Sequence, residues 1–199
     1  MTGRIRVLAI AAAVLIGTAI GLAVSLWYVP AGGPTRSGAA AIGGPFTLVD
    51  QDGQTRTERD FRGRFMLVTF GYTHCPDICP VTVQAIGDTL EQLGPAADQV
   101  AGIFVSVDPQ RDTPAALKDY VQSVSPRIVA LTGSPAQVAA AARAYRVYYR
   151  VNGDPARDQH YTVDHTALLY LMDRDGRFVT HFTHQTPAAT MVAAIRRVL

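Results

Sequence analysis

The sequence predicts a three-layer α/β domain with a mixed central sheet, and two observations predict it. Short apolar segments typical of buried strands alternate with amphipathic helices, which is the order expected for parallel strands covered by helices. Near the carboxyl end, two strand-like segments are joined by the turn DRDG, and so short a turn connects antiparallel strands. A final helical segment follows this hairpin.

Two unbroken apolar segments predict the centre of the sheet. Segment 65–72, FMLVTFGY, has the composition of a strand covered on both faces, and segment 102–107, GIFVSV, is similar. The other predicted strands are 46–49, 127–131, 147–151, 161–172 and 177–182, of which the last two form the hairpin.

Hydrophobic periodicity and capping signals place four helices between and after these strands. In segment 77–93, apolar residues recur at steps of three and four, and we expect them to face the core. These residues are Ile78, Val81, Ala85, Ile86 and Leu90. Residues 112–114, Asp-Thr-Pro, offer an N-cap and a proline at the first helical position before a helix at 115–124. The other helices are predicted at 135–144 and 187–198.

An uncharged segment near the start of the chain predicts a membrane anchor. Residues 7–29 would form a helix about 34 Å long, which is enough to cross the hydrocarbon core of a bilayer. Arg4 and Arg6 precede it, so the positive-inside rule places residues 1–6 in the cytoplasm and the remainder of the chain outside. The alternative is a cleaved signal peptide, but this apolar segment is longer than such peptides carry.

A linker separates the predicted anchor from the domain. Residues 30–44 are rich in glycine, proline and small side chains, which is the composition of a flexible tether. We therefore place the folded domain at residues 45–199. Charged residues make up only 17% of the chain and the net charge is +2, with no basic cluster, so nucleic-acid binding is excluded.

Cys75 and Cys79, in the segment GYTHCPDICP, are the only cysteines of the chain. They stand where a buried strand meets a helix, which is the thioredoxin-like arrangement. A structural disulfide between them would close a loop of about five residues and add little stability. Because N–H groups at a helix start favour thiolates, the pair indicates redox or metal chemistry. Pro76 is expected to fix the loop backbone and thereby preorganise the two cysteine sulfurs. Asp77 is expected to cap the helix or to face a partner.

Two thiolates and one imidazole would form a three-coordinate site that suits Cu(I) and can hold Cu(II). A structural zinc site would need four ligands. On one continuous strand His160 and His165 would face opposite sides, so at most one of them can face the cysteines. The candidates for the third ligand are His74, His160, His165, His181 and His184, and spacing alone leaves the choice open.

Four segments of the predicted domain resemble the SCO/SenC family of copper chaperones, which are membrane-anchored proteins of thioredoxin fold. The segments are FTLVDQDG at 46–53, FGYTHCPDICP at 70–80, SVDPQRDTP at 106–114 and VDHTALLYLMDRDG at 163–176. The resemblance covers nearly the whole domain, and its motifs occur in the order typical of the family.

The resemblance implies that Cys75, Cys79 and His165 bind one copper ion, as Cu(I), Cu(II) or both, and that the two cysteines also form a redox disulfide. Asp108 and Asp112 are expected to shape the loop beside the site, with turn formation and helix capping as equally good roles.

By the same resemblance, the protein assists assembly of the binuclear copper site in subunit II of cytochrome c oxidase. It would act as a metallochaperone rather than an enzyme. Members of the family are anchored to bacterial or mitochondrial inner membranes, and because a long Ser- and Arg-rich presequence is missing we expect a bacterial inner membrane, with the domain on the periplasmic side. Other copper chaperones and thioredoxin-like reductants are further candidate partners.

Three other functions remain open. A membrane-anchored thiol-disulfide oxidoreductase would reduce target cysteines and would not need His165, although its usual motif has two residues between the cysteines, not three. A peroxiredoxin-type peroxidase would have Thr or Ser where this chain has Tyr72. A copper-dependent redox sensor would change a partner contact when it loses its metal.

Overall fold

The computed structural model describes residue 18 and residues 42–199, and the latter belong to a compact unit that spans Ala41–Leu199. The predicted anchor at 7–29, apart from residue 18, and most of the predicted linker lie outside the described residues. Within the described part of the chain, no helix has the length and apolar character needed to span a membrane.

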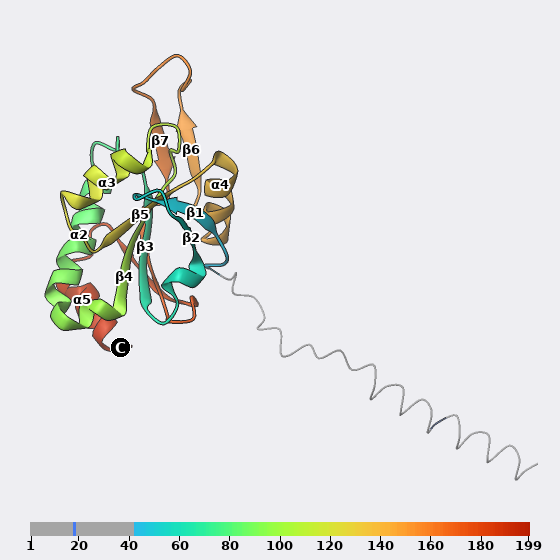
Figure 1. Ribbon diagram of the computed structural model, residues 1–199. Coiled ribbons are helices and arrows are strands. Elements are labelled where there is room, and N and C mark those ends of the chain that lie inside the picture. The colour runs from blue at the N-terminus through green and yellow to red at the C-terminus, as the bar shows by residue number, and fades with distance from the viewer. Residues whose placement is uncertain (1–17, 19–41) are drawn as a thin grey trace, which may run out of the picture. The chain divides into compact units, whose positions relative to one another are not determined.

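A seven-stranded mixed sheet forms the centre of this unit (Figure 1). Its strands are β1 (Thr47–Asp50), β2 (Thr55–Thr57), β3 (Phe65–Gly71), β4 (Val100–Ser106), β5 (Ile128–Thr132), β8 (Leu168–Met172) and β9 (Phe178–Thr183), in the spatial order β2-β1-β5-β4-β3-β8-β9. The three inner strands β3, β4 and β5 are parallel, and the outer strands pair antiparallel. The mixed sheet predicted from the sequence is confirmed.

Helices cover both faces of the sheet. On one face, α2 (Ile78–Leu93), α3 (Pro114–Gln122) and α5 (Ala188–Arg196) pack over one core cluster, while α4 (Pro135–Ala144) packs over a second cluster on the other face (Figure 1). All seven residues of β3 and of β4 are buried, since helices cover both sides of these strands. Two short 3₁₀ helices, Glu58–Phe61 and Gly94–Gln99, complete the unit.

Capping residues stabilise the first turns of α3 and α4, close to the starts that the sequence predicted. Thr113 is the N-cap of α3 and accepts a hydrogen bond from the N–H of Ala116, with Pro114 at the first helical position. Ser134 and Gln137 form a capping box at the start of α4. These contacts satisfy N–H groups that the helix itself leaves unpaired.

The segment 161–172 is not one strand, so that prediction is wrong. It divides into β7 (Thr162–His165) and β8, and β7 pairs with β6 (Tyr149–Asn152) in a separate two-stranded sheet. The break occurs where the N–H of Thr166 donates to the carbonyl of Tyr148, while Leu168 pairs with Thr183 of the main sheet. The predicted hairpin is therefore β8–β9, and the β6–β7 hairpin stands beyond the main sheet (Figure 1).

Val81 is also placed differently from the prediction. It was expected in the core, but its side chain is 53% exposed. Five positions separate it from the fully buried Ile86, which turns it about 140° around the helix axis, away from the sheet.

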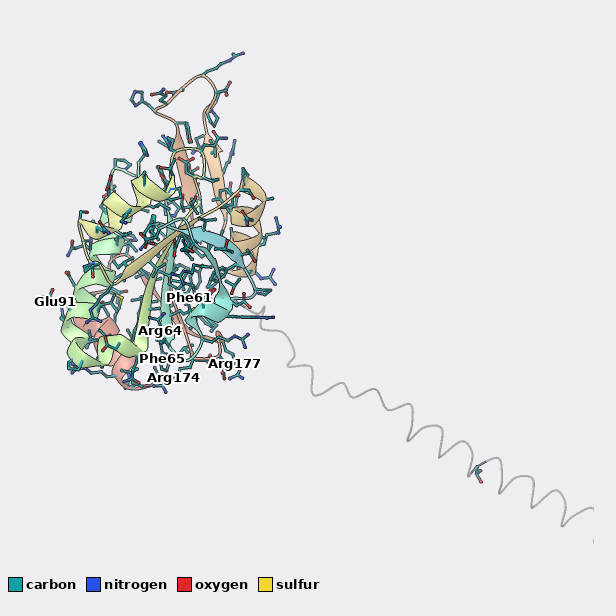
Figure 2. All side chains as sticks on the ribbon, viewed as in Figure 1. Phe61, Arg64, Phe65, Glu91, Arg174 and Arg177 are labelled. Atoms are coloured by element: carbon teal, nitrogen blue, oxygen red, sulfur yellow. The ribbon has the colours of Figure 1, made fainter. Side chains whose placement is uncertain are left out.

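At the end of the sheet opposite the β6–β7 hairpin, a cationic side chain of the β8–β9 turn lies against an aromatic ring of β3. Arg174, in the turn between β8 and β9, lies over the ring of Phe65 at the start of β3, with 5.4 Å between the guanidinium carbon and the ring centre (Figure 2). The cysteine loop and the loop that carries Asp108 and Asp112 lie at the other end, because they follow the carboxyl ends of the parallel strands β3 and β4.

Candidate metal centre

The cysteine loop leaves the carboxyl end of β3 and runs into α2. Cys75 lies in this loop, where its N–H donates to the carbonyl of Tyr72 at 3.3 Å, and its side chain is half-buried. Cys79 is the second residue of α2 and is only 2% exposed. Both are free thiols.

Pro80 is compatible with the first turn of α2, whereas Asp77 does not cap this helix. Pro80 is the third residue of α2, where its missing N–H removes no helical hydrogen bond, and Pro76 is exposed in the loop. Asp77 holds the N-cap position, but its carboxylate accepts no capping hydrogen bond, so the predicted cap is wrong. Its backbone, at φ −134° and ψ −82°, is outside the extended conformation that N-cap residues adopt.

Glycine at position 71 lets the sulfur approach the end of β3. A Cβ atom there would lie 2.8 Å from the Sγ of Cys79 and 2.9 Å from the ring of Phe104. Glycine therefore provides the space that the buried sulfur occupies.

His165 ends β7 and turns its ring toward the sulfurs. Its Nδ1 lies 3.2 Å from the carbonyl oxygen of Thr166, and its Nε2 lies 3.2 Å from the Sγ of Cys79. Because a carbonyl only accepts, Nδ1 carries the proton in this contact and the Nε2 lone pair faces the sulfur. Burial lowers the pKa of His165, which favours the neutral ring, and the ring of Tyr72 packs against it edge to face at 5.9 Å.

The three side chains converge. The two Sγ atoms and one imidazole nitrogen all lie within 4.8 Å of one another. Burial raises the pKa of the Cys79 thiol, so in the absence of a cation this sulfur keeps its proton. A soft metal ion would replace the proton and take two thiolates and one imidazole as ligands, a donor set that suits copper.

The other histidines lie elsewhere. His74 is exposed and contacts the hydroxyl of Thr73, while His160 is exposed in the loop that joins β6 to β7. His181 is on β9, where it stacks on Phe178. His160 precedes β7, and of the two histidines only His165 belongs to the cluster with the cysteines among the described residues.

Asp112 connects the cysteine loop to the loop after β4. Its side chain is fully buried and accepts hydrogen bonds from the N–H and hydroxyl of Thr73 and from the hydroxyl of Ser106. Burial raises the pKa of Asp112, although these hydrogen bonds act in the opposite direction. The carboxylate thereby holds the start of the cysteine loop against β4.

Asp108 and Arg111 connect the same loop to the β6–β7 hairpin. Asp108 accepts from the hydroxyl of Tyr161 at 2.6 Å and from Nε of Arg111 at 2.6 Å. Nη1 of Arg111 donates to the carbonyls of Gln159 and Tyr161, and its guanidinium lies over the Tyr161 ring. Sequence reasoning did not single out Arg111 or Tyr161, and their only signal was that Arg111 lies between the two aspartates of SVDPQRDTP.

Comparisons with a family model, with known proteins and with solved structures all identify the same family. The family model SCO1/SenC matches residues 34–199. The bovine mitochondrial SCO2 homologue is 43% identical over 161 residues, which cover 79% of this chain and 60% of that protein. SenC of Rhodobacter capsulatus is 39% identical over 181 residues, covering 87% of this chain and 80% of that one. The structure of Bradyrhizobium japonicum ScoI with copper bound is 47% identical, with a TM-score of 0.74, and covers 80% of this chain and all of that one.

This chain therefore belongs to the SCO1/SenC family, and its domain has the thioredoxin-like α/β fold with a mixed sheet. It spans about three fifths of the length of its mammalian SCO2 relatives.

Proposed function

We propose that this SCO1/SenC protein is a copper metallochaperone, which binds one copper ion through Cys75, Cys79 and His165. The observation that carries the proposal is the convergence of the three ligand atoms within 4.8 Å. ScoI of Bradyrhizobium japonicum, which is similar over the whole domain, is described with copper bound, and this supports copper as the metal.

The acceptor in this proposal is the binuclear copper site of subunit II of cytochrome c oxidase, as the resemblance to the SCO/SenC family implies. Copper is the cargo, so it must be held and also released. Cys79 and His165 are the inner ligands, since Cys79 is 2% exposed and His165 is fixed by its contact with Thr166. Cys75 is half-buried in a loop, so it is the ligand that an acceptor thiolate can displace first.

Each step of this exchange conserves charge and electrons. The thiols of Cys75 and Cys79 lose protons when copper binds, because the metal ligand is the thiolate. When an acceptor thiolate takes the place of Cys75 on the metal, the freed Cys75 thiolate regains a proton. The copper keeps its oxidation state throughout this ligand exchange.

The uncharged segment near the start of the chain supports a proposed location at the inner membrane. In this proposal residues 7–29 anchor the chain, residues 1–6 lie in the cytoplasm, residues 30–44 form a tether and residues 45–199 work on the periplasmic side. The uncharged segment and the preceding Arg4 and Arg6 support it. Protease added to spheroplasts should then degrade the domain without lysis.

The second candidate function is reduction of the disulfide of an acceptor. Two free thiols close together favour it. One thiolate attacks the acceptor disulfide, the other resolves the mixed disulfide, and two electrons and two protons pass to the acceptor while Cys75 and Cys79 become a disulfide. His165 has no necessary part in that reaction.

The test measures copper stoichiometry and affinity of the reduced full chain under anaerobic conditions. The wild-type protein should bind close to one copper per chain. Cys75→Ser, Cys79→Ser and His165→Ala should each weaken binding at least about tenfold. His181→Ala is the matched control, because His181 lies on β9 outside the cluster. Retention of wild-type affinity by His165→Ala, together with loss of disulfide reduction in both serine variants, would favour the reductase.

A further inference from the structure

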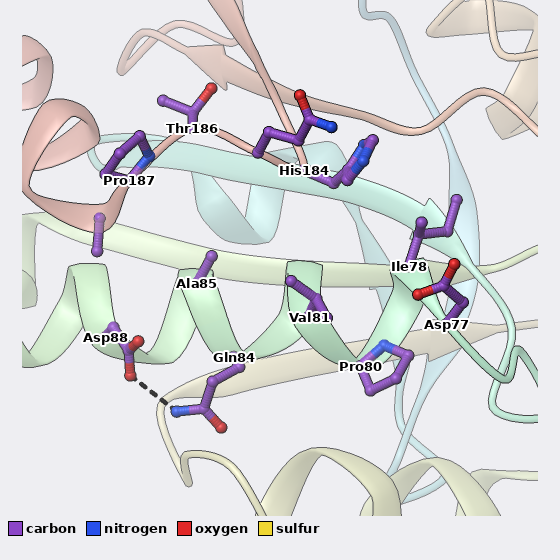
Figure 3. Close-up of a pocket in the computed structure, with 12 residues that line it drawn as sticks. Asp77, Ile78, Pro80, Val81, Gln84, Ala85, Asp88, His184, Thr186 and Pro187 are labelled. Atoms are coloured by element: carbon purple, nitrogen blue, oxygen red, sulfur yellow. Dashed lines mark hydrogen bonds between the residues drawn. The ribbon is translucent and has the colours of Figure 1, made fainter.

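A groove of about 780 Å³ runs along α2, beginning beside the cysteine loop (Figure 3). One wall is the outer face of α2, and the other is the connection between β9 and α5, residues 184–187, together with Ala188 at the start of α5. Asp77 and Ile78, which line one end, stand between the two cysteines in the chain. Whatever occupies the groove therefore lies next to the candidate metal centre.

The α2 wall is a single stripe. Val81, Gln84 and Asp88 are separated by steps of three and four residues, which places them on one side of the helix, and Asp77 at the N-cap lines the same groove (Figure 3). Eleven residues separate Asp77 from Asp88, or about 16 Å along the axis. Val81 and Gln84 lie between them, and Val81 is 53% exposed, so the stripe has an exposed apolar side chain between its two acidic ends.

The charged side chains that line the groove indicate which kind of partner it would bind. The described lining of the groove contains the carboxylates of Asp77 and Asp88 and no lysine or arginine, and His184 is its other titratable side chain. The Asp77 carboxylate does not cap α2, and that of Asp88 accepts from the amide of Gln84. The surface is therefore complementary to an apolar segment that carries positive charge at both ends.

We propose that this groove binds an extended segment of the copper acceptor with an apolar residue at its centre and Lys or Arg two positions away on each side. Residues i, i+2 and i+4 of an extended chain share one face and span about 13 Å, and the long basic side chains cover the remaining distance to Asp77 and Asp88. The proposal rests on the proposed function, because it names how the acceptor is held while copper passes through Cys75.

The test uses a blocked, fluorescently labelled peptide, Lys-Ala-Leu-Ala-Lys, and the full chain without copper. The peptide should bind measurably more tightly than its counterpart Glu-Ala-Leu-Ala-Glu, and binding should weaken as salt is raised. Asp88→Lys and Val81→Ser should each weaken binding by about 3- to 10-fold. Asp119→Lys on α3 and Val151→Ser on β6 are the matched controls, since both positions are exposed outside the groove.

Equal binding of the two peptides, or equal binding by Asp88→Lys and wild type, would overturn the proposal. So would a concentration-dependent dimer that Val81→Ser dissociates, because the occupant would then be a second copy of the chain. Copper stoichiometry of both groove variants, measured in parallel, should equal that of the wild type. A failure of the groove is thereby distinguished from a failure of copper binding.

Discussion

Nε2 of His165 lies 3.2 Å from Sγ of Cys79, although 86 positions separate the two residues in the chain. The histidine comes from the β6–β7 hairpin and the cysteine from the first turn of α2, so the site exists only when the hairpin is correctly placed over the main sheet. Arg111 and Asp108 hydrogen-bond to the hairpin, Tyr161 and Val163 are buried in the core, and β6 and β7 do not pair with the described strands of the main sheet.

The two thiols of the metal-free protein should differ in reactivity. Cys75 is half-buried, whereas Cys79 is 2% exposed and burial raises the pKa of its thiol. Since the thiolate is the reactive form, iodoacetamide at pH 8 should modify Cys75 at least about tenfold faster than Cys79. Mass spectrometry of peptides after timed quenching measures both rates, and a denatured sample in which both rates agree is the control. Faster modification of Cys79 would contradict the buried position of this sulfur.

Adding a single methyl group at Gly71 should lower both the stability of the fold and the affinity for copper. In Gly71→Ala the new methyl group would lie 2.8 Å from the Sγ of Cys79, so the sulfur or the Phe104 ring must move. We expect a loss of about 1–3 kcal/mol in the free energy of unfolding and weaker copper binding. Gly102→Ala is the matched control, because its methyl group would press on Ile86 and Leu90 and not on a sulfur. If both variants lose stability but both keep wild-type copper affinity, Gly71 serves only the packing.

The sequence predicted those parts of the fold that local patterns determine. The buried strand β3 follows from its unbroken apolar run, and the cysteine loop follows from its position before an amphipathic helix. The division of 161–172 could not be predicted, because Thr166 and Ala167 carry no turn signal and the break depends on a hydrogen bond to the distant Tyr148. His165 was consequently one candidate among five until the family resemblance was considered.

Helical periodicity also could not show which apolar residues of α2 are left exposed. It placed Val81 in the core because the residue is apolar and close in spacing to buried neighbours, yet within the described part of the chain Val81 faces an open groove and is 53% exposed. The contacts of Arg111 could not be predicted from local patterns either, since they join the loop after β4 to backbone carbonyls about fifty positions away in the sequence.

Stability at low pH should depend on Asp50. Its carboxylate accepts from the N–H groups of Asp52 and Gln54 and from Nε of Arg56. Burial alone would raise the pKa of Asp50, but the hydrogen bonds, led by that of Arg56, lower it below the ordinary value. The folded protein then holds this proton less tightly than the unfolded chain does. The stabilisation is therefore present above the unfolded pKa of about 3.9 and is lost as the pH falls through the folded pKa.

Asp50→Asn is accordingly expected to lower the free energy of unfolding by about 1–3 kcal/mol at pH 7, and by less at pH 3. Urea denaturation at the two pH values measures this difference. Asp52→Asn is the control, because its exposed carboxylate pairs with the partly exposed Lys118 and should contribute little. A loss at pH 3 as large as that at pH 7 would show that the charge of Asp50 is not what stabilises the turn.

Arg111→Lys should loosen the β6–β7 hairpin while leaving the main sheet intact. Nη1 of Arg111 donates to the carbonyls of Gln159 and Tyr161 while Nε donates to Asp108, and the compact ammonium of lysine cannot reproduce this fork. Amide hydrogen exchange at 153–161 should accelerate about tenfold, and copper should dissociate faster because the hairpin carries His165. Arg157→Lys is the matched control, since Arg157 is exposed in the same loop and forms a surface ion pair with Asp154 at 3.4 Å. Unchanged exchange in Arg111→Lys would mean that the strand pairing of β6 with β7 holds the hairpin by itself.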